Sequence, residues 1–368
     1  MTYLQDHAIP FILLTNGGGK REAERVSEIS RLLGLSKPLG VKNFVQSHTP
    51  FAGFLTPSLN GSSPQSLTGS STILVVGGEG AKCRDVAENY GFQNVVTPGD
   101  IYTAHPEVWP FSHVFNSYYS RFAVPLSRSI NPENPASSLK IDAIFVFNDP
   151  RDWALDSQLI LDILLSRSGI LGTTSSKNGD RTLPNKGFQQ DDQPPLYFSN
   201  PDLLWAAGYH IPRLGQGGFR HALEGIWQRL TDGARLQSTT IGKPSGLTYA
   251  FAEKTLHTSE RDVKHDPNCD LELNDASHDL DVRESQGLRK VYMIGDNPES
   301  DIMGANTFQS SRGTQWVSIL VNTGVYTEEV KGRYDMVARP ELKPRFVADD
   351  VRAAVNRALK DSQWEGRI

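Results

Sequence analysis

Two carboxylates, Asp296 and Asp301, follow a short apolar run, Val291–Ile294, that has the length of a buried strand. Carboxylates placed together at the end of such a strand repel each other unless a cation lies between them. The spacing therefore predicts a Mg²⁺ site. The simpler alternative is an acidic turn that holds no metal.

A second candidate group follows the apolar run Phe11–Thr15, which we interpret as another buried strand. Thr15 and Asn16 precede three consecutive glycines, beginning at Gly17, where the backbone can turn tightly or approach a ligand closely. A hydroxyl and free backbone N–H groups at the carboxyl end of a strand suit a phosphate oxygen. A turn with a capping threonine is the alternative.

A third candidate is Lys243, which stands between Gly242 and Pro244 and ahead of the helical pattern Leu247–Leu256. A lysine in a loop is usually solvated, but these two neighbours fix the backbone around it, and we expect the side chain to be aimed at a ligand. A hydroxyl, a lysine and a metal-binding carboxylate pair are the groups that hold a transferring phosphoryl group. We expect the three loops to meet at one sheet edge, at a topological switch point.

The elements that must position these groups alternate between strands and helices, which predicts an α/β fold with a doubly wound parallel sheet. Further strands are predicted at Ile73–Val76, Ala143–Phe147, Leu196–Ser199 and Trp316–Val321. Residues 61–205 carry their own strands and helices, and we expect them to form an inserted α/β domain. Residues 1–60 and 206–368 would form the two parts of the core. Polar, apolar-poor stretches at 58–72, 168–195 and 257–286 are predicted as loops or surface insertions.

Composition excludes several classes of protein. The chain has 368 residues and a net charge of −5, so nothing in it favours nucleic acid or an anionic membrane surface as a partner. It contains no run of 18 apolar residues, and no membrane span is expected. Gly78 and Gly80 lack the third glycine of a dinucleotide-binding loop, since Cys83 stands in its place, so a plain strand–helix unit is favoured.

The order of these motifs resembles that of the haloacid dehalogenase-like hydrolase superfamily, in the subfamily with a large α/β cap (subfamily IIA). PFILLTNGGG resembles its second motif, IGKPS its third and GDNPESD its fourth. The segments FVFNDPRDWALD and SNPDLLWAAGYHIPRLGQGGF resemble the cap of the cat-eye-syndrome-region branch, whose fungal members are mostly mitochondrial proteins. The resemblance covers the chain outside the three polar stretches.

The resemblance implies a Mg²⁺-dependent phosphatase of a small phosphorylated metabolite. It implies that Thr15, with Asn16 and Gly17, binds the phosphoryl group, and that Lys243 steadies it. It further implies that Asp296 ligates Mg²⁺ with Asp301 in support, and that Asn200 and Asp202 line the substrate entrance between cap and core. A mitochondrial location follows from the resemblance alone, with a cytoplasmic one as the alternative. The substrate's identity stays open, and so does a homo-oligomer.

One motif of the superfamily has no match in the chain. Its first motif is an Asp-x-Asp on the central strand, and the first of these aspartates is the nucleophile that becomes an aspartyl phosphate. Only 14 residues precede Thr15, and Asp6 is the one acidic residue among them. A strand and its crossover helix need more chain than that. We therefore expect a truncated form that lacks the central strand and is inactive as given.

Two other functions remain open at this point. The chain could keep the fold as a non-catalytic binding protein, or it could belong to glycerophospholipid metabolism, because some fungal relatives carry phosphatidyl-transferase labels. An Asp-x-Asp spacing does occur at Asp279 and Asp281, but within the polar stretch 257–286 rather than at the end of a predicted strand.

Overall fold

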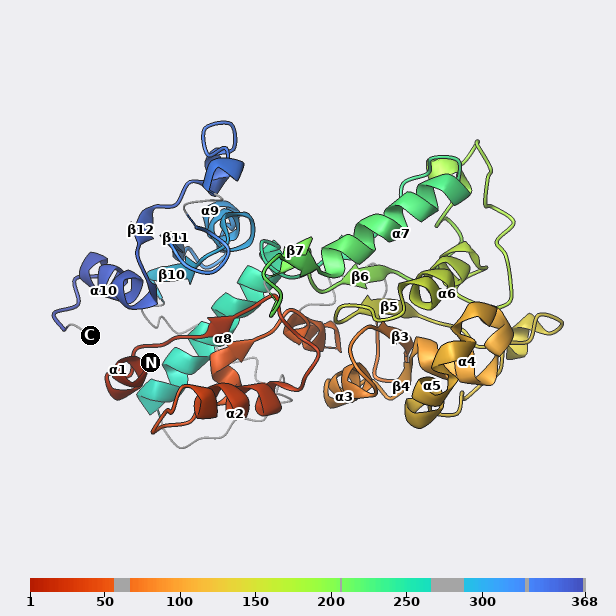
Figure 1. The fold of residues 1–368 in the computed structure, drawn as a ribbon, viewed down its shortest axis with the longest axis horizontal. Coiled ribbons are helices and arrows are strands. Elements are labelled where there is room, and N and C mark those ends of the chain that lie inside the picture. The colour runs from red at the N-terminus through yellow and green to blue at the C-terminus, as the bar shows by residue number, and fades with distance from the viewer. Residues whose placement is uncertain (56–66, 206, 266–287, 328–330, 367–368) are drawn as a thin grey trace. The chain divides into compact units, whose positions relative to one another are not determined.

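The computed structural model describes residues 1–55, 67–205, 207–265, 288–327 and 331–366 (Figure 1). These residues form two compact units. The first unit comprises Met1–Thr15, Val26–Val45 and Gly242–Ile368, and the second comprises Asn16–Arg25 and Gln46–Ile241. The chain therefore passes between the units four times, and Thr15 and Asn16 stand on either side of the first crossing.

The second unit is built on a five-stranded sheet with the order β4-β3-β5-β6-β9. Its strands are β3 (Thr72–Val76), β4 (Asn94–Val96), β5 (Ala143–Val146), β6 (Leu196–Phe198) and β9 (Thr239–Thr240). Every ladder in this sheet is parallel. The four residues of β5 are all buried, as expected of a central parallel strand that helices cover on both faces.

Helices pack around this sheet, and a short hairpin follows β6. The helices are α3 (Lys82–Asn89), α4 (Pro98–Ala104), α5 (Asn116–Phe122), α6 (Trp153–Leu165) and α7 (Gln216–Leu230), and the hairpin strands are β7 (Leu204–Trp205) and β8 (Arg213–Leu214). The main core of the unit joins Phe198 of β6, Leu159 of α6 and Trp227 of α7, all fully buried. Burying one such side chain stabilises the fold by about 1.5–3 kcal/mol.

The first unit contains two separate sheets. One is parallel, with the order β10-β11-β12, and the other pairs β1 with β2 in parallel. The strands are β1 (Leu13–Leu14), β2 (Phe44–Val45), β10 (Lys290–Gly295), β11 (Gln315–Val321) and β12 (Phe346–Ala348). The helices are α1 (Thr2–Asp6), α8 (Gly246–His265), α9 (Met303–Thr307) and α10 (Val351–Asp361), together with the part of α2 (Glu22–Leu32) that follows Arg25.

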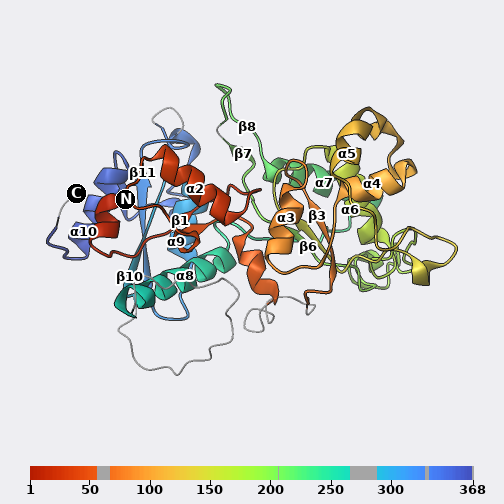
Figure 2. The ribbon, with the colours of Figure 1, turned by 90° about the horizontal axis from the view of Figure 1, so that it is seen from below.

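The alternation of side chains along β10 explains how helices cover the sheet of the first unit. Tyr292 packs with Ala354 of α10, whereas Met293 packs with Tyr249 of α8. Figure 2 shows the helices α10 and α8 beside the strands β10 and β11. Leu14 of β1 packs against the Tyr249 cluster. Among the described residues, no hydrogen-bonded ladder joins β1 to β10.

The parallel ladders confirm the predicted α/β class, and several boundaries differ from the sequence-based expectation. The second unit continues to Ile241, past the expected end at residue 205, because α7 packs into its core and β9 pairs with β6. Helix α8 runs to His265, so the polar stretch expected from residue 257 begins with helix. Residues 168–195 form turns with one 3-10 segment, η7 (Pro184–Gly187).

Asp279 and Asp281 lie outside the described residues, as do residues 58–66 of the predicted linker. None of the described helices is long and apolar enough to cross a membrane.

Candidate functional site

Lys243 follows β9 and is directed at the end of β1. Its side chain is almost wholly buried, and its Nζ donates hydrogen bonds to the Leu14 carbonyl oxygen at 3.0 Å and to Asp301 Oδ1 at 2.6 Å. Gly242, with φ of +96°, sets the turn into this position, a conformation that favours glycine. A buried ammonium group is costly unless it is paired, so this lysine is held in place by its partners.

Asp301 lies in a π-helical turn, η8 (Pro298–Ile302), which follows β10. Its second oxygen, Oδ2, accepts a hydrogen bond from the Asn297 backbone N–H at 3.0 Å, so both carboxylate oxygens are engaged. The turn closes tightly on the strand end, because a Cβ placed on Gly295 would lie 2.1 Å from Asp301 Oδ2. Only glycine fits at that position.

Tyr249 of α8 stabilises the η8 turn by hydrogen bonding to two of its carbonyl groups. Its hydroxyl lies 3.1 Å from the Ser300 carbonyl oxygen and 2.9 Å from that of Asp301. Burial raises the pKa of Tyr249 well above its usual value, and the negative charge of Asp301 adds to the shift. The phenol therefore stays protonated and acts as a hydrogen-bond donor that positions Asp301.

Asp296 stands at the carboxyl end of β10 and is held by the loop that follows β11. Its Oδ2 accepts a hydrogen bond from the Val325 backbone N–H at 2.6 Å. Gly324 has φ of +65°, and a Cβ placed there would lie 2.0 Å from Asp296 Oδ2. A glycine at this position thus allows the close approach that orients the carboxylate.

Thr15 lies at the same end of β1 as the Lys243 ammonium group, since it follows Leu14 directly. Its backbone N–H donates to the Val45 carbonyl oxygen at 3.0 Å, which extends the β1–β2 ladder by one bond. The structure therefore brings Lys243 and Asp301 into direct contact and places Thr15 beside Leu14, their shared neighbour. All of these residues belong to the first unit.

The other predicted site residues belong to the second unit, and they also lie together. Asn16 is buried, and its Nδ2 donates to Asp202 Oδ1 at 3.2 Å. Asn200 Oδ1 accepts from the Asp202 backbone N–H at 2.8 Å, which fixes the turn after β6. The Gly17 carbonyl oxygen accepts from the Ser47 backbone N–H at 3.2 Å.

The donor set fits Mg²⁺ through Asp296 rather than through both predicted carboxylates. Mg²⁺ keeps several waters in proteins and is often bound through one or two carboxylates plus phosphate oxygens. The charge of Asp301 is already balanced by Lys243, so this residue supports the lysine. In the part of the chain that the structure describes, no group of three or more His, Cys, Asp or Glu side chains could enclose an ion.

Sequence reasoning missed Tyr249 as a positioning residue, because a tyrosine in an amphipathic helix looks like ordinary core. It also missed a buried polar network in the second unit. There Glu22 Oε1 accepts from the Thr49 hydroxyl at 2.7 Å and from the Tyr90 hydroxyl at 2.5 Å, and His48 Nδ1 lies 2.7 Å from Tyr90. The one signal was the polar run Gln46–Thr49 directly after an apolar strand.

Comparisons with known proteins agree with this arrangement of motifs. Residues 1–93 match the family described as Haloacid dehalogenase-like hydrolase, and residues 240–354 match the family described as HAD-hydrolase-like. A mitochondrial hydrolase of Saccharomyces cerevisiae is 36% identical over 362 residues, which cover 97% of this chain and 88% of that relative.

A cardiolipin synthase (CMP-forming)/mitochondrial hydrolase fusion protein of Schizosaccharomyces pombe is 32% identical over 362 residues. The match covers 98% of this chain and 49% of the fusion protein, so the chain spans about half the length of that relative. The crystal structure of a hypothetical protein from Pyrococcus horikoshii shares the fold, with a TM-score of 0.51 at 17% identity over 98% of this chain and 89% of the other. The chain belongs to the haloacid dehalogenase-like hydrolase family.

Proposed function

We propose that the protein is a Mg²⁺-dependent phosphohydrolase of a small phosphorylated metabolite. The observation that carries this proposal is the position of Lys243, whose buried ammonium group contacts both Leu14 at the end of β1 and Asp301 in η8. Three segments that are distant in sequence thus meet within the first unit, and the proposal assigns to them the groups that phosphoryl transfer requires.

Each residue has a distinct part in this proposal. Lys243 neutralises the charge that develops on the equatorial phosphoryl oxygens, and Asp301 and Tyr249 keep its ammonium group oriented. Thr15 offers a hydroxyl to a phosphoryl oxygen. Asp296 would hold Mg²⁺ through its carboxylate, and the ion when bound would supply a Lewis acid that stabilises negative charge on the phosphoryl group.

The second unit contributes substrate selection in the same proposal. Asn16 and Gly17 follow Thr15 and would offer an amide and backbone groups to the phosphoryl oxygens. Asn200 and Asp202 would line the substrate entrance, where the Asn16–Asp202 hydrogen bond sets their position. A mitochondrial location is part of the proposal, because the relative from Saccharomyces cerevisiae is named a mitochondrial hydrolase.

The proposal also holds that these 368 residues alone do not turn over a phosphate ester. Groups that position a phosphate are present, but no Asp-x-Asp stands at the end of a described strand to supply the attacking carboxylate. The test compares the chain with a version that carries an added strand ending in Asp-x-Asp ahead of Met1. We expect Mg²⁺-dependent hydrolysis of p-nitrophenyl phosphate only from the extended version.

Substitutions in the extended version test the individual roles. Lys243→Ala should lower kcat roughly 10²- to 10³-fold, the cost of losing one donor aimed at transition-state charge. Asp296→Asn should raise the Mg²⁺ concentration needed for half-maximal activity, since a neutral amide is a weaker ligand for a hard cation. Lys254→Ala is the matched control, because this lysine is exposed on α8.

Two outcomes would overturn parts of the proposal. Turnover by the unextended chain, abolished by Asp296→Asn, would place the nucleophile within these 368 residues. Unchanged activity in both Lys243→Ala and Asp296→Asn would show that the motifs do not form the site. An extended version that binds phosphate and Mg²⁺ without turnover would instead favour a non-catalytic binding protein.

A further inference from the structure

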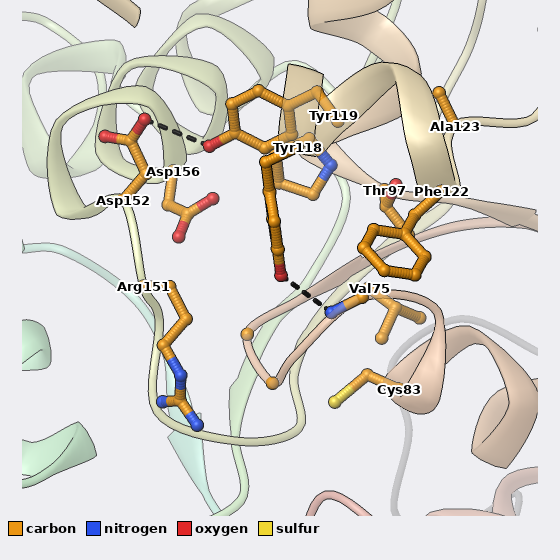
Figure 3. A pocket seen from close by; sticks show the side chains of 15 residues that line it. Val75, Cys83, Thr97, Tyr118, Tyr119, Phe122, Ala123, Arg151, Asp152 and Asp156 are labelled. Atoms are coloured by element: carbon orange, nitrogen blue, oxygen red, sulfur yellow. Dashed lines mark hydrogen bonds between the residues drawn. The ribbon is translucent and has the colours of Figure 1, made fainter. Parts of the chain in front are cut away.

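The second unit contains a pocket of its own at the carboxyl ends of β3 and β5 (Figure 3). The strand order places β4 on one side of β3 and β5 on the other, so the connections leave this point in opposite directions. Ligands of open α/β sheets bind at such switch points. The pocket lies within this unit and holds none of the residues assigned above to phosphoryl transfer.

Glycines and aromatic rings form the walls of this pocket. A Cβ on Gly78 would lie 2.5 Å from Cys83 Sγ, and one on Gly80 would lie 3.0 Å from the Phe122 ring. The loop after β3 therefore packs closely against α3 and α5 and leaves little room for side chains at these two positions. Tyr118 on α5 accepts a hydrogen bond from the Gly80 backbone N–H at 2.7 Å. The rings of Tyr118 and Phe122 lie 5.3 Å apart and face the same space.

One of the two carboxylates in the pocket is fully engaged. Asp152 Oδ1 caps α6 by accepting from the Leu155 backbone N–H at 3.2 Å. Its Oδ2 accepts from the Ser112 hydroxyl at 2.6 Å and from the Tyr119 hydroxyl at 3.0 Å. This carboxylate is therefore held in one orientation at the pocket wall.

The other carboxylate, Asp156, has no such side-chain partners among the described residues. It lies one turn further along α6 and is 5% exposed, and its carboxyl group accepts a hydrogen bond from the Asp152 backbone N–H. Figure 3 shows its carboxyl group pointing into the pocket near the Tyr118 ring. Burial raises the pKa of Asp156 well above its usual value, and the neighbouring charge of Asp152 adds to this.

The one cationic side chain at the pocket is committed elsewhere. Arg151 is exposed, and its guanidinium group donates to the Asp149 carbonyl oxygen at 2.7 Å and to Asn148 Oδ1 at 3.5 Å. In Figure 3 it extends away from Asp156. Burying a carboxylate without a countercharge is costly, and a bound cation would offset that cost.

The geometry points to a binding site for a small primary amine, with the ammonium group between Asp156 and the Tyr118 ring. An ammonium group adds a countercharge and further N–H donors to Asp156, and aromatic faces attract cations. The cavity of about 60 Å³ has room for roughly four to six water-sized groups, which limits the ligand to a molecule the size of ethanolamine.

Isothermal titration calorimetry with ethanolamine on the full chain tests this site. We expect saturable one-to-one binding and no binding of ethylene glycol, which has the same number of non-hydrogen atoms and no charge. Because burial and the charge of Asp152 raise the pKa of Asp156, and only the ionised carboxylate pairs with the amine, ethanolamine should bind more tightly as the pH rises. Titrations at several pH values measure that dependence.

Two substitutions on α6 make the test specific. Asp156→Asn removes the charge and keeps the shape, so the fold should persist while ethanolamine binding weakens roughly 10- to 100-fold and the pH dependence of its affinity disappears. Asp162→Asn is the matched control. This carboxyl group is also partly buried on α6, but it accepts a hydrogen bond from Gln158 at 2.8 Å and lines a different cavity.

Three results would overturn the inference. They are the absence of ethanolamine binding by the wild-type chain, equal binding of ethylene glycol, and unchanged ethanolamine affinity in the Asp156→Asn variant whose circular dichroism spectrum matches that of the wild type. An equal loss of affinity in the Asp162→Asn variant would also contradict it, since that residue does not reach this pocket.

Discussion

At the scale of single residues, burial fixes the protonation state of the His48 side chain. It is fully buried, its Nδ1 lies 2.7 Å from the Tyr90 hydroxyl, and its Nε2 has no hydrogen-bond partner among the described residues. Burial lowers the pKa of His48 from 6.5 to about 4, although the Glu22 carboxylate opposes the shift. His48 is therefore neutral in the folded protein at neutral pH.

This protonation predicts a loss of stability in mild acid. Between pH 6.5 and 4 the unfolded His48 takes up a proton that the folded residue does not, so the free energy of unfolding falls as the pH falls through that range. The full effect is on the order of 3 kcal/mol for a shift of about 2.5 pKa units. Urea unfolding of wild type and His48→Asn at several pH values measures it.

Carboxylates elsewhere in the chain also titrate in mild acid. The difference between the unfolding free energies of the wild type and His48→Asn therefore isolates the contribution of His48. We expect the wild type to lose more stability than the variant on acidification. Parallel pH profiles for the two proteins would mean that His48 is protonated in the folded state as readily as in the unfolded chain.

Sequence patterns pointed to the residues of the candidate site, but not to the contacts that these residues make with one another. Lys243 and Asp301 stand out from their flanking glycine and proline residues, and the structure places the two in contact. The ion pair itself could not be predicted, because Asp301 was interpreted with Asp296 as a metal-binding pair. Asp156 escaped notice in an apolar helix, although a carboxylate among leucines is itself a signal of burial.

At the scale of elements, a buried ion pair joins α3 to the start of α4. Arg84 Nη2 lies 2.7 Å from both carboxylate oxygens of Asp100, and its Nη1 donates to the Val95 carbonyl oxygen of β4 at 2.8 Å. Asp100 also accepts from the Val124 backbone N–H at 2.7 Å. One guanidinium–carboxylate pair thus connects two helices, a strand and the segment after α5.

Removing the guanidinium group should destabilise the second unit strongly. Arg84→Met keeps the aliphatic stem but leaves Asp100 buried without its countercharge, and we expect a loss of about 3–5 kcal/mol in the free energy of unfolding. Lys82→Ala on the same helix is the control. Its pair with Glu79 is exposed, so the expected change is within about 0.5 kcal/mol.

Urea titrations followed by far-ultraviolet circular dichroism compare the two variants with the wild type. Equal midpoints for Arg84→Met and Lys82→Ala would show that water or a rearranged side chain replaces the buried pair.

Strands with continuous apolar runs were predictable, and short polar strands were not. The predictions for β3, β5, β6 and β11 are confirmed to within one residue at each end, because short apolar runs rich in Val, Ile, Leu and Phe and bounded by turn residues favour a buried strand. Strands β4 and β9 were missed. Their residues, such as Thr239 and Thr240, pair at the flanks of the sheet, where backbone hydrogen bonds decide the structure rather than side-chain hydrophobicity.

At the scale of the whole molecule, each unit has hydrophobic clusters of its own. Trp227 belongs to the core of the second unit, and Trp316 packs against Tyr249 in the first, with ring centroids 5.0 Å apart. The assignment of residues 206–241 to the second unit depends on contacts of α7 with distant helices. No local sequence pattern reports such contacts, so that boundary was not predictable.

Separate cores predict separate unfolding transitions. In variants that keep a single tryptophan, fluorescence of Trp227 and of Trp316 should report different urea midpoints. Arg84→Met should lower the Trp227 midpoint alone. Tyr249→Phe should lower the Trp316 midpoint alone, since it removes the hydroxyl that holds the carbonyl groups of η8.

Coincident transitions that shift together in both variants would show instead that the two units unfold as one cooperative body. The same fluorescence measurements decide this without any further labelling.

The four crossings between the units also set an order of events during synthesis on the ribosome. The last segment of the second unit ends at Ile241, and the ribosome must add 107 more residues (348 minus 241) before β12 is complete at Ala348. At about 5–20 residues per second, that interval lasts roughly 5–21 s, far longer than most single domains need to fold. The second unit can thus fold while β1 and β2 have been synthesised and β10–β12 have not. Chaperones that bind nascent chains would then encounter the first unit while it is still incomplete.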